Sequence, residues 1–244
     1  MEYPPEDKPI GRRALLGMLG LGGVGILWGA KIQDGLDRLL RPVTLHDATG
    51  LTNFLPTAGR FRIYSVTGTL PKRSEAAYRL AVAGLVDRPT TLDLGALRTS
   101  LPQTQLTRDF QCVTGWRVQD VHWRGVALPA LLDHVGAHPD ATHVRFRSFD
   151  GVYTETLTLE QARRPDVLVA HEMLGKPVTR EHGGPVRLYV APMYGYKSLK
   201  WLDRIEVVAH LDDDRDPGYW ERYGYDTDGW VGASNGRHDE RTSP

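Results

Sequence analysis

A succession of short β-type segments separated by turn residues is the feature that most constrains the fold of this chain. Turn signals stand between the segments at Gly68, Gly84, 87–89 and Asp150-Gly151. Strands and helices do not alternate in a regular βαβ order, so the pattern predicts an α+β domain with a mixed β-sheet. We expect strands at residues 60–67, 78–86, 143–148, 153–157 and 186–190.

Short helices fit some of the intervals between these strands, at residues 92–98, 128–135 and 159–163. The last of them begins after Thr158, a good N-cap residue, and Gln161 stands three positions later, as in a capping box. Residues 212–244 are acidic and rich in Trp and Tyr, whose rings supply much buried area. We expect this C-terminal segment to pack over the domain as a strap.

Composition excludes several classes of protein. The 244 residues are 41% hydrophobic and 25% charged, which argues against wholesale disorder and against a multi-span membrane protein. Thirty Lys+Arg balance thirty Asp+Glu, and a net charge of zero argues against a nucleic-acid partner. The single cysteine, Cys112, excludes an internal disulfide, a Cys-rich zinc module and an iron–sulfur cluster held by this chain alone.

The N-terminal region has the pattern of a targeting signal. Arg12 and Arg13 precede residues 14–30, which contain no charge and include six glycines. As a helix this run would be about 26 Å long, against roughly 30 Å for the hydrocarbon core of a bilayer. A paired arginine before a weakly apolar run is typical of twin-arginine export signals. We therefore expect an N-terminal hydrophobic helix, either a removed signal or a transmembrane anchor.

The basic residues lie before the apolar run. The positive-inside rule keeps such residues on the cytoplasmic side of the membrane, so the rest of the chain is expected on the outer side. This predicts a protein of the cell envelope, at the outer face of the cytoplasmic membrane. Three regions follow from these patterns: a signal or anchor with its connector at 1–41, an oxidoreductase domain at 42–211 whose chemistry is argued below, and the C-terminal strap at 212–244.

One candidate chemical segment contains Cys112, in the run Phe110-Gln-Cys-Val-Thr-Gly-Trp116, followed by Arg117. A lone cysteine is most often a small buried apolar residue. The neighbouring Arg117 changes this interpretation, because a nearby cation favours the thiolate form that soft metals bind.

A second segment carries glycines and cations between residues 182 and 200. Gly183-Gly184 lets the backbone approach a ligand closely, and Arg187, Lys197 and Lys200 supply charges for a phosphate. On composition alone, a solvated basic hairpin explains these residues equally well.

Taken together, several ordered blocks resemble the molybdopterin-binding domain of the sulfite oxidase superfamily. The Cys-Val-x-x-Trp form is similar to the exported bacterial branch that contains the methionine-sulfoxide reductase catalytic subunit. The similarity covers residues 60–208, and ordered blocks at sensible spacing are more specific than a single motif. The blocks are 110–116, Trp123-Arg-Gly-Val126, Ser148-Phe-Asp-Gly151, 182–188 and 194–202.

The resemblance implies a molybdenum-molybdopterin cofactor in a sulfite oxidase-type domain. It makes Cys112 the one protein ligand of molybdenum, with two further sulfurs from the pterin dithiolene, in agreement with the preference of such metals for soft ligands. His182 matches a position that contacts the pterin, where that branch often has Asn. Arg187 and Lys200 match residues that hold the phosphate end of the cofactor.

The resemblance implies further cofactor contacts with less direct matches. Ser148 matches a small hydroxyl residue, and Lys197 and Ser198 lie in the same loop as Lys200. For the N-terminal contact, Arg62 is the first candidate and Asn53 the second.

Three residues are candidates for the substrate side of the pocket. Trp116 and Arg117 follow the cysteine closely enough to line a pocket, and Tyr194 would hydrogen-bond an oxo group of the metal. A packed aromatic ring, a surface cation and a core tyrosine explain the same three residues equally well.

Two departures from the family pattern leave the substrate and the assembly open. Thr114 stands where the reductase branch tends to have Glu, and the Gly-Asn-Arg type of sequence seen after the cysteine in sulfite oxidases is absent. Residues 209–244 are too few for the large dimerisation domain of sulfite oxidases, so we expect a monomer or a hetero-complex.

These features predict a molybdopterin-dependent oxidoreductase that performs two-electron chemistry of the oxygen-atom-transfer type on a small substrate. The chain carries no second redox centre, so a membrane haem or quinone-linked partner is expected to exchange electrons with it. Two alternatives remain: a non-catalytic exported binding domain with a vestigial pocket, and a subunit that only relays electrons.

Overall fold

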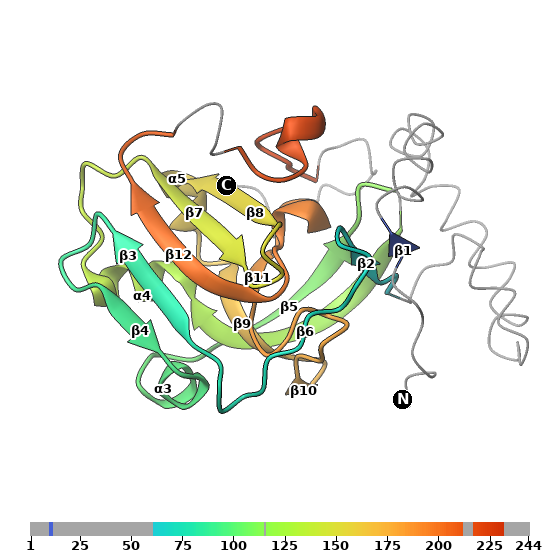
Figure 1. Cartoon of the computed structure of the whole chain (residues 1–244), viewed down its shortest axis with the longest axis horizontal. Coiled ribbons are helices and arrows are strands. Elements are labelled where there is room, and N and C mark those ends of the chain that lie inside the picture. The colour runs from blue at the N-terminus through green and yellow to red at the C-terminus, as the bar shows by residue number, and fades with distance from the viewer. Residues whose placement is uncertain (1–9, 12–60, 115, 212–216, 232–244) are drawn as a thin grey trace, which may run out of the picture.

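Two five-stranded sheets form the body of the chain in a computed structural model that describes residues 10–11, 61–114, 116–211 and 217–231 (Figure 1). The first sheet has the order β4-β3-β12-β7-β8, and β12 pairs in parallel with β3 but antiparallel with β7. Its strands are β3 Leu80–Gly84, β4 Thr90–Leu92, β7 His143–Ser148, β8 Thr154–Thr158 and β12 Leu202–Val208.

The second sheet is antiparallel throughout, in the order β10-β9-β6-β5, and β11 also pairs with β9. Its strands are β5 Thr104–Gln111, β6 Arg117–Ala127, β9 Val167–Met173, β10 Lys176–Pro177 and β11 Arg187–Val190. A further parallel pair joins β1 Ile10–Gly11 to β2 Tyr64–Ser65. The α+β class with a mixed sheet is confirmed.

The helices are short and each begins or ends where the sequence provides a cap. In α5 the Thr158 side chain accepts from the Gln161 backbone and the Gln161 side chain accepts from the Thr158 backbone, which is the expected capping box. Gly136 ends α4 in a left-handed conformation. The helices are α3 Leu94–Thr99, α4 Leu128–Val135 and α5 Leu159–Ala162, with 3-10 turns η2 Gly195–Lys197 and η3 Glu221–Tyr223.

Strand β9 is buried on both faces and joins two hydrophobic clusters. Val167 and Val169 pack into the core shared with the first sheet, whereas Leu168 and Ala170 pack into a second core with the aromatic residues of β5 and β6. A strand covered on both faces is apolar without alternation. The stiff β9 thereby supports the long β5–β6 hairpin, whose far end carries Cys112.

The structure describes only part of the N-terminal region for which the sequence predicts a strand and a hydrophobic helix. The expected strand at 60–67 is reduced to the two residues of β2 in the described part of that range. The expected hydrophobic helix at 14–30 lies outside the described residues, as do both arginines before it. Of the helices in the described ranges, none combines the length and apolar character needed to cross a bilayer.

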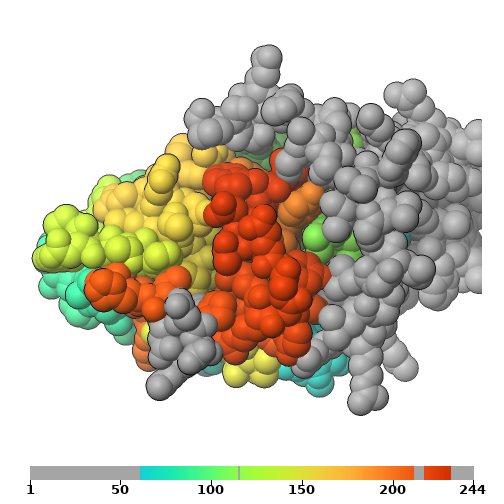
Figure 2. Space-filling model, turned by 90° about the horizontal axis from the view of Figure 1, so that it is seen from above, coloured from blue at the N-terminus to red at the C-terminus, as the bar shows by residue number. Residues whose placement is uncertain are grey.

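Residues 217–231, the described part of the C-terminal segment, pack on the domain (Figure 2). We call this segment the strap. The backbone N–H of Tyr219 donates to the carbonyl of Thr154 on β8 at 2.8 Å, and the N–H of Val231 donates to the carbonyl of Pro192 at 3.0 Å. The strap therefore begins on the first sheet and ends near η2.

Candidate functional site

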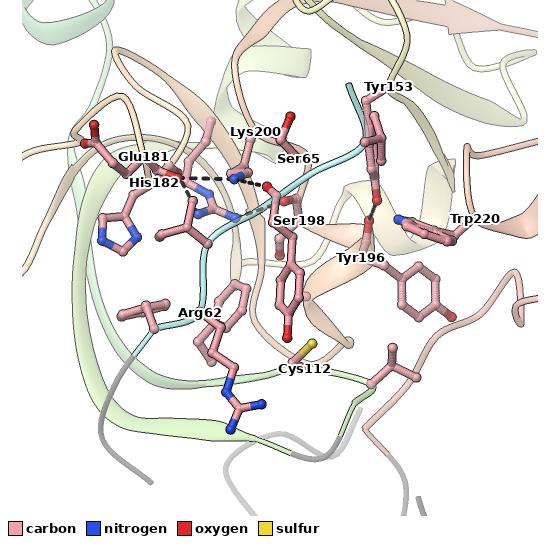
Figure 3. A pocket seen from close by; sticks show the side chains of 18 of the residues that line it. Arg62, Ser65, Cys112, Tyr153, Glu181, His182, Tyr196, Ser198, Lys200 and Trp220 are labelled. Carbon is pink, nitrogen blue, oxygen red and sulfur yellow. Dashed lines mark hydrogen bonds between the residues drawn. The ribbon is translucent and has the colours of Figure 1, made fainter. Parts of the chain in front are cut away.

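A cavity opens at the end of the β5–β6 hairpin, between η2, the loop before β11 and the strap (Figure 3). Six segments that are distant in sequence contribute to its lining: 61–66, 110–113 with Trp116, 150–153, 181–187, 195–201 and 220–225. Most of the residues that the sequence singled out are brought together here: Arg62, Cys112, Trp116, His182, Arg187, Ser198 and Lys200.

Cys112 lies at the hairpin end, immediately after β5. Its backbone N–H donates to the carbonyl of Trp116 at 2.9 Å, and its Sγ lies 3.2 Å from Oγ1 of Thr114. The thiol is half-buried, and this burial raises its pKa, while the Thr114 hydroxyl and then the Arg62 charge act in the opposite direction. Arg62, rather than Arg117, is therefore the cation that favours the thiolate.

Aromatic rings surround the thiol. Trp116 is buried, stacks on Phe110 with ring centroids 5.7 Å apart, and donates from Nε1 to the hydroxyl of Tyr64 at 3.2 Å. Burial, and then Cys112, raise the pKa of Tyr64. Burial and Cys112 also raise the pKa of Tyr225, to about 12, so two neutral tyrosines of the cavity wall lie close to the thiol.

Arg187 is a buried cation on β11 that bonds only to uncharged oxygens. Nη1 donates to the carbonyl of His182 at 2.8 Å, Nη2 to the carbonyl of Ser198 at 2.9 Å and Nε to that of Leu188 at 3.3 Å. Its guanidinium also lies over the rings of Phe110 and Trp123. Burial lowers the pKa of Arg187 to about 10, which leaves it charged at neutral pH.

Lys200 repeats this arrangement on the facing segment. Its Nζ donates to the carbonyls of Tyr64 at 2.5 Å and Glu181 at 3.2 Å (Figure 3). Burial, and then Arg187, lower the pKa of Lys200 to about 7. Among the described residues, no carboxylate forms an ion pair with either Arg187 or Lys200. Arg187 and Lys200 therefore bring positive charge to the cavity, while Asp150 and Glu181, which line the same cavity, act on Lys200 without a direct ion pair.

His182 lies beside these cations in an uncharged state. Burial, followed by Arg187 and Lys200, lowers the pKa of His182 to about 3. Its ring meets the edge of Phe61, with centroids 4.8 Å apart. A neutral imidazole presents one donor and one acceptor, which suits the mixed donors and acceptors of a heterocyclic ligand.

The structure does not bring Lys197 into the cavity lining, contrary to the expectation that it contacts the cofactor. Its Nζ donates to Oε1 of Glu155 at 2.6 Å, to the carbonyl of Thr156 at 2.8 Å and to Oε1 of Glu221. Burial opposes its charge, but the two carboxylates outweigh burial and raise the pKa of Lys197. All three of its donor positions are thus used by the protein.

Three other expected residues also lie outside the cavity lining, although each is close to it in sequence. Arg117 is buried and its Nε is 3.7 Å from Asp109. The hydroxyl of Ser148 accepts from the backbone of Asp150 at 3.1 Å. Tyr194 packs on Tyr196, with ring centroids 6.4 Å apart. Asn53, the alternative to Arg62, is outside the described residues.

Ser198 does line the cavity, but its side chain is used by the fold: its hydroxyl accepts from the backbone N–H of Val190 at 3.0 Å. The sequence interpretation missed Tyr64, Asp150, Trp220 and Tyr225, which also line the cavity. The strap was expected to cover the domain, and its aromatic content was the available signal for the last two. The proximity of Tyr64 depends on a non-repetitive segment for which no pattern exists.

Residues 67–220 match the family model of the oxidoreductase molybdopterin binding domain. The match spans more than half of the chain, which therefore belongs to this family. The protein is a molybdopterin-dependent oxidoreductase, and its cofactor is molybdenum-molybdopterin.

Relatives cover the chain to different extents. It is 28% identical over 256 residues to the protein-methionine-sulfoxide reductase catalytic subunit MsrP of Gluconobacter oxydans, across 96% of this chain and 80% of that protein. It is 34% identical over 167 residues to sulfite oxidase of Arabidopsis thaliana, across 54% of this chain and 42% of that protein.

A solved structure shares the fold. The sulfane dehydrogenase SoxCD of Paracoccus pantotrophus superposes with a TM-score of 0.52 at 21% identity, over 62% of this chain and 47% of that one.

The side chains that line the cavity are chemically suited to the cofactor of this family. Arg187 and Lys200 bring two cationic side chains to the cavity, and among the described residues they are held by backbone carbonyls and not by ion pairs, which suits a buried phosphate. Cys112 supplies a single thiolate to the same cavity. Within the described ranges, no cluster of three or more His, Cys, Asp or Glu side chains could bind a metal unaided.

Proposed function

We propose that this protein reduces a small, uncharged S-oxide, of the methionine-sulfoxide type, at a molybdenum held by Cys112. The observation that carries the proposal is that His182 and Lys200 lie on one side of the cavity, its cationic end, and Tyr196 and Trp220 on the other, its aromatic end, with Cys112 below both groups in this view (Figure 3). The cationic end suits the cofactor, and the aromatic end suits an uncharged substrate.

The chain's own residues hold and orient the cofactor. Cys112 would ligate the metal, Arg187 and Lys200 would bind the phosphate, and His182 and Arg62 would contact the pterin. When bound, the cofactor supplies the two-electron, oxygen-atom-transfer chemistry. The protein fixes its position through a stiff strand pair and excludes water with the rings around Cys112.

The substrate class is argued from the walls of the cavity near Cys112. Aromatic surface comes from Tyr64, Trp116, Trp220 and Tyr225. Arg62 is the cation whose charge lowers the pKa of the Cys112 thiol. Aromatic rings favour a neutral sulfur compound with apolar substituents, whereas an inorganic anion would need several charge-assisted donors. The full-length similarity to a protein-methionine-sulfoxide reductase catalytic subunit supports the same choice.

We also propose export and a redox partner in the envelope. Arg12 and Arg13 before the apolar run at 14–30 support twin-arginine export and a location at the outer face of the cytoplasmic membrane. A membrane haem or quinone-linked protein would deliver the electrons, because confinement to one surface raises its effective concentration. Residues 42–211 would act as the oxidoreductase domain of a monomer or hetero-complex.

The test is an assay of the purified protein with a reduced artificial dye as electron donor. Each turnover takes two electrons and two protons, and converts the S-oxide to the sulfide and water. We expect turnover of methionine sulfoxide with the dye, and none with NAD(P)H alone. Oxidation of sulfite to sulfate with a dye acceptor, without turnover of any S-oxide, would contradict the proposed substrate class.

A further inference from the structure

The strap, which lies on the surface of the domain (Figure 2), contributes residues near the C-terminus to the cavity wall. Trp220 is buried and Tyr225 is half-buried, and both line the cavity together with Cys112. Trp220 also packs on Tyr219 and Tyr225, with ring centroids 5.2 and 5.3 Å apart. The shape of the cavity near the thiol therefore depends on where the strap sits.

A buried charge cluster ties the strap to the body of the protein. Lys197 on η2 donates to Glu155 on β8 and to Glu221 on the strap, and the exposed fractions of these side chains are 0%, 0% and 4%. A second carboxylate oxygen of Glu221 accepts from the backbone N–H of Gly218 at 2.7 Å. At the other end of the strap, a Cβ on Gly229 would lie 2.8 Å from Cγ of Lys197.

We propose that Lys197 is a positioning residue that holds the strap against the cavity, so that Trp220 and Tyr225 determine which substrates reach Cys112. This inference rests on the proposed function for its substrate but not for its geometry. Lys197 acts through Glu221 and touches neither cofactor nor substrate. Buried ion clusters are better suited to fixing one arrangement than to adding stability, which is the role assigned here.

The cluster has one cation, Lys197, and two carboxylates, Glu155 on the body and Glu221 on the strap. Replacing one carboxylate at a time therefore separates the bond that holds the strap from the bond within the body. Burial and the neighbouring Glu221 raise the pKa of Glu155 to about 8 despite the opposing effect of Lys197. Lys197 donates to both carboxylates, so each can be removed separately. After Glu221→Gln, the amide carries no charge and offers one acceptor oxygen to two donors, Lys197 and Gly218. Glu155 is then the carboxylate that remains beside Lys197, so the ion pair lies within the body and no longer holds the strap.

Glu155→Gln is the matched control, because it makes the same chemical change but leaves the Lys197–Glu221 pair in place. Gly218→Ala is a second test that alters no charge. A Cβ at Gly218 would lie 2.6 Å from Oε1 of Glu155 and 3.1 Å from Cδ of Glu221, so the strap must move away from the cluster.

The experiment compares the cofactor-loaded, full-length wild type with these three variants. Arg222 is exposed on the strap, so the rate of tryptic cleavage after Arg222 measures how often the strap opens. We expect cleavage to be about tenfold faster in Glu221→Gln and Gly218→Ala, and within twofold of wild type in Glu155→Gln. The KM for methionine sulfoxide should rise about tenfold in the first two variants, with kcat changed less than threefold.

Equal cleavage rates in wild type and Glu221→Gln would overturn the proposal. A loss of molybdenum in Glu221→Gln but not in Glu155→Gln would also overturn it, because the cluster would then support the cofactor rather than the strap. If the wild type reduces no S-oxide, the proposed function fails by itself, and the cleavage rates still decide the role of Lys197.

Discussion

Arg187 donates from Nη1 to the carbonyl oxygen of His182 at 2.8 Å, and both residues line the cavity that contains Cys112. The bond ties a buried cation to the loop before β11. Because each hydrogen bond of Arg187 within the described residues goes to a backbone carbonyl, its charge is solvated by dipoles and not paired with a carboxylate. An incoming phosphate would therefore gain a charge-assisted partner without displacing a carboxylate of the protein.

Arg187→Ala should reduce molybdopterin occupancy at least tenfold per folded chain. The change removes the cation, and it leaves buried carbonyls unpaired at a cost of about 1–3 kcal/mol each. Arg187→Lys should also lose cofactor, because an ammonium cannot reproduce the planar fork. The matched control is Arg163→Ala, which removes an exposed pair with Asp133. Equal pterin content in Arg187→Ala and Arg163→Ala would contradict the placement of the phosphate.

Cys112→Ala should abolish molybdenum binding and leave the fold intact. Cys112 is the only cysteine of the chain, and thiolate is the protein ligand that suits this metal. The half-buried position predicts a loss of only about 1 kcal/mol in the free energy of unfolding. Metal analysis and thermal unfolding by circular dichroism provide the two readouts. Full activity with normal molybdenum content would refute the ligand assignment.

Lys200 predicts a pH dependence of stability in the cofactor-free chain. Its pKa is about 7 when folded and about 10.4 in an unfolded chain, so the unfolded state binds more protons between these values. Stability should therefore rise as pH increases from 7 to 9. Urea midpoints should show a smaller rise in Lys200→Met than in wild type. An identical pH dependence in the two proteins would contradict a lowered pKa of Lys200 in the folded chain.

The sequence was a good guide to β3, β7, β8, β11 and the helices. The expected ranges 128–135 and 143–148 coincide with α4 and β7, because a clear apolar face and flanking turn residues define both. It was a poor guide to β5, β6, β9 and β12. β9 has no alternation because it is buried on both faces, and β5 mixes charged and apolar residues along its length.

For the site, the sequence could identify residue types but not their partners. Lys197 and Lys200 stand three residues apart in one loop and were expected to share a role. The structure separates them, because η2 turns Lys197 toward the carboxylate of Glu155, whereas Lys200 donates to the carbonyls of Tyr64 and Glu181. Which of two lysines finds a buried carboxylate depends on β8 and the strap, and these contacts are non-local.

The proposed export route predicts the effect of replacing both Arg12 and Arg13 with Lys. Twin-arginine transport carries folded, cofactor-loaded proteins, so the variant should accumulate in the cytoplasm in an active form. Cell fractionation with the dye-linked assay on each fraction measures the distribution. The wild type serves as the control, and unchanged envelope localisation of the variant would contradict this route.

The most direct test of the account is the molybdenum and pterin content of wild-type protein purified from an envelope fraction of a host that makes the cofactor. Mass spectrometry for the metal and fluorescence of the oxidised pterin give both quantities. We expect close to one molybdenum and one pterin per chain, because the cavity with Cys112, Arg187 and Lys200 would hold one cofactor. Folded protein that contains neither would contradict it.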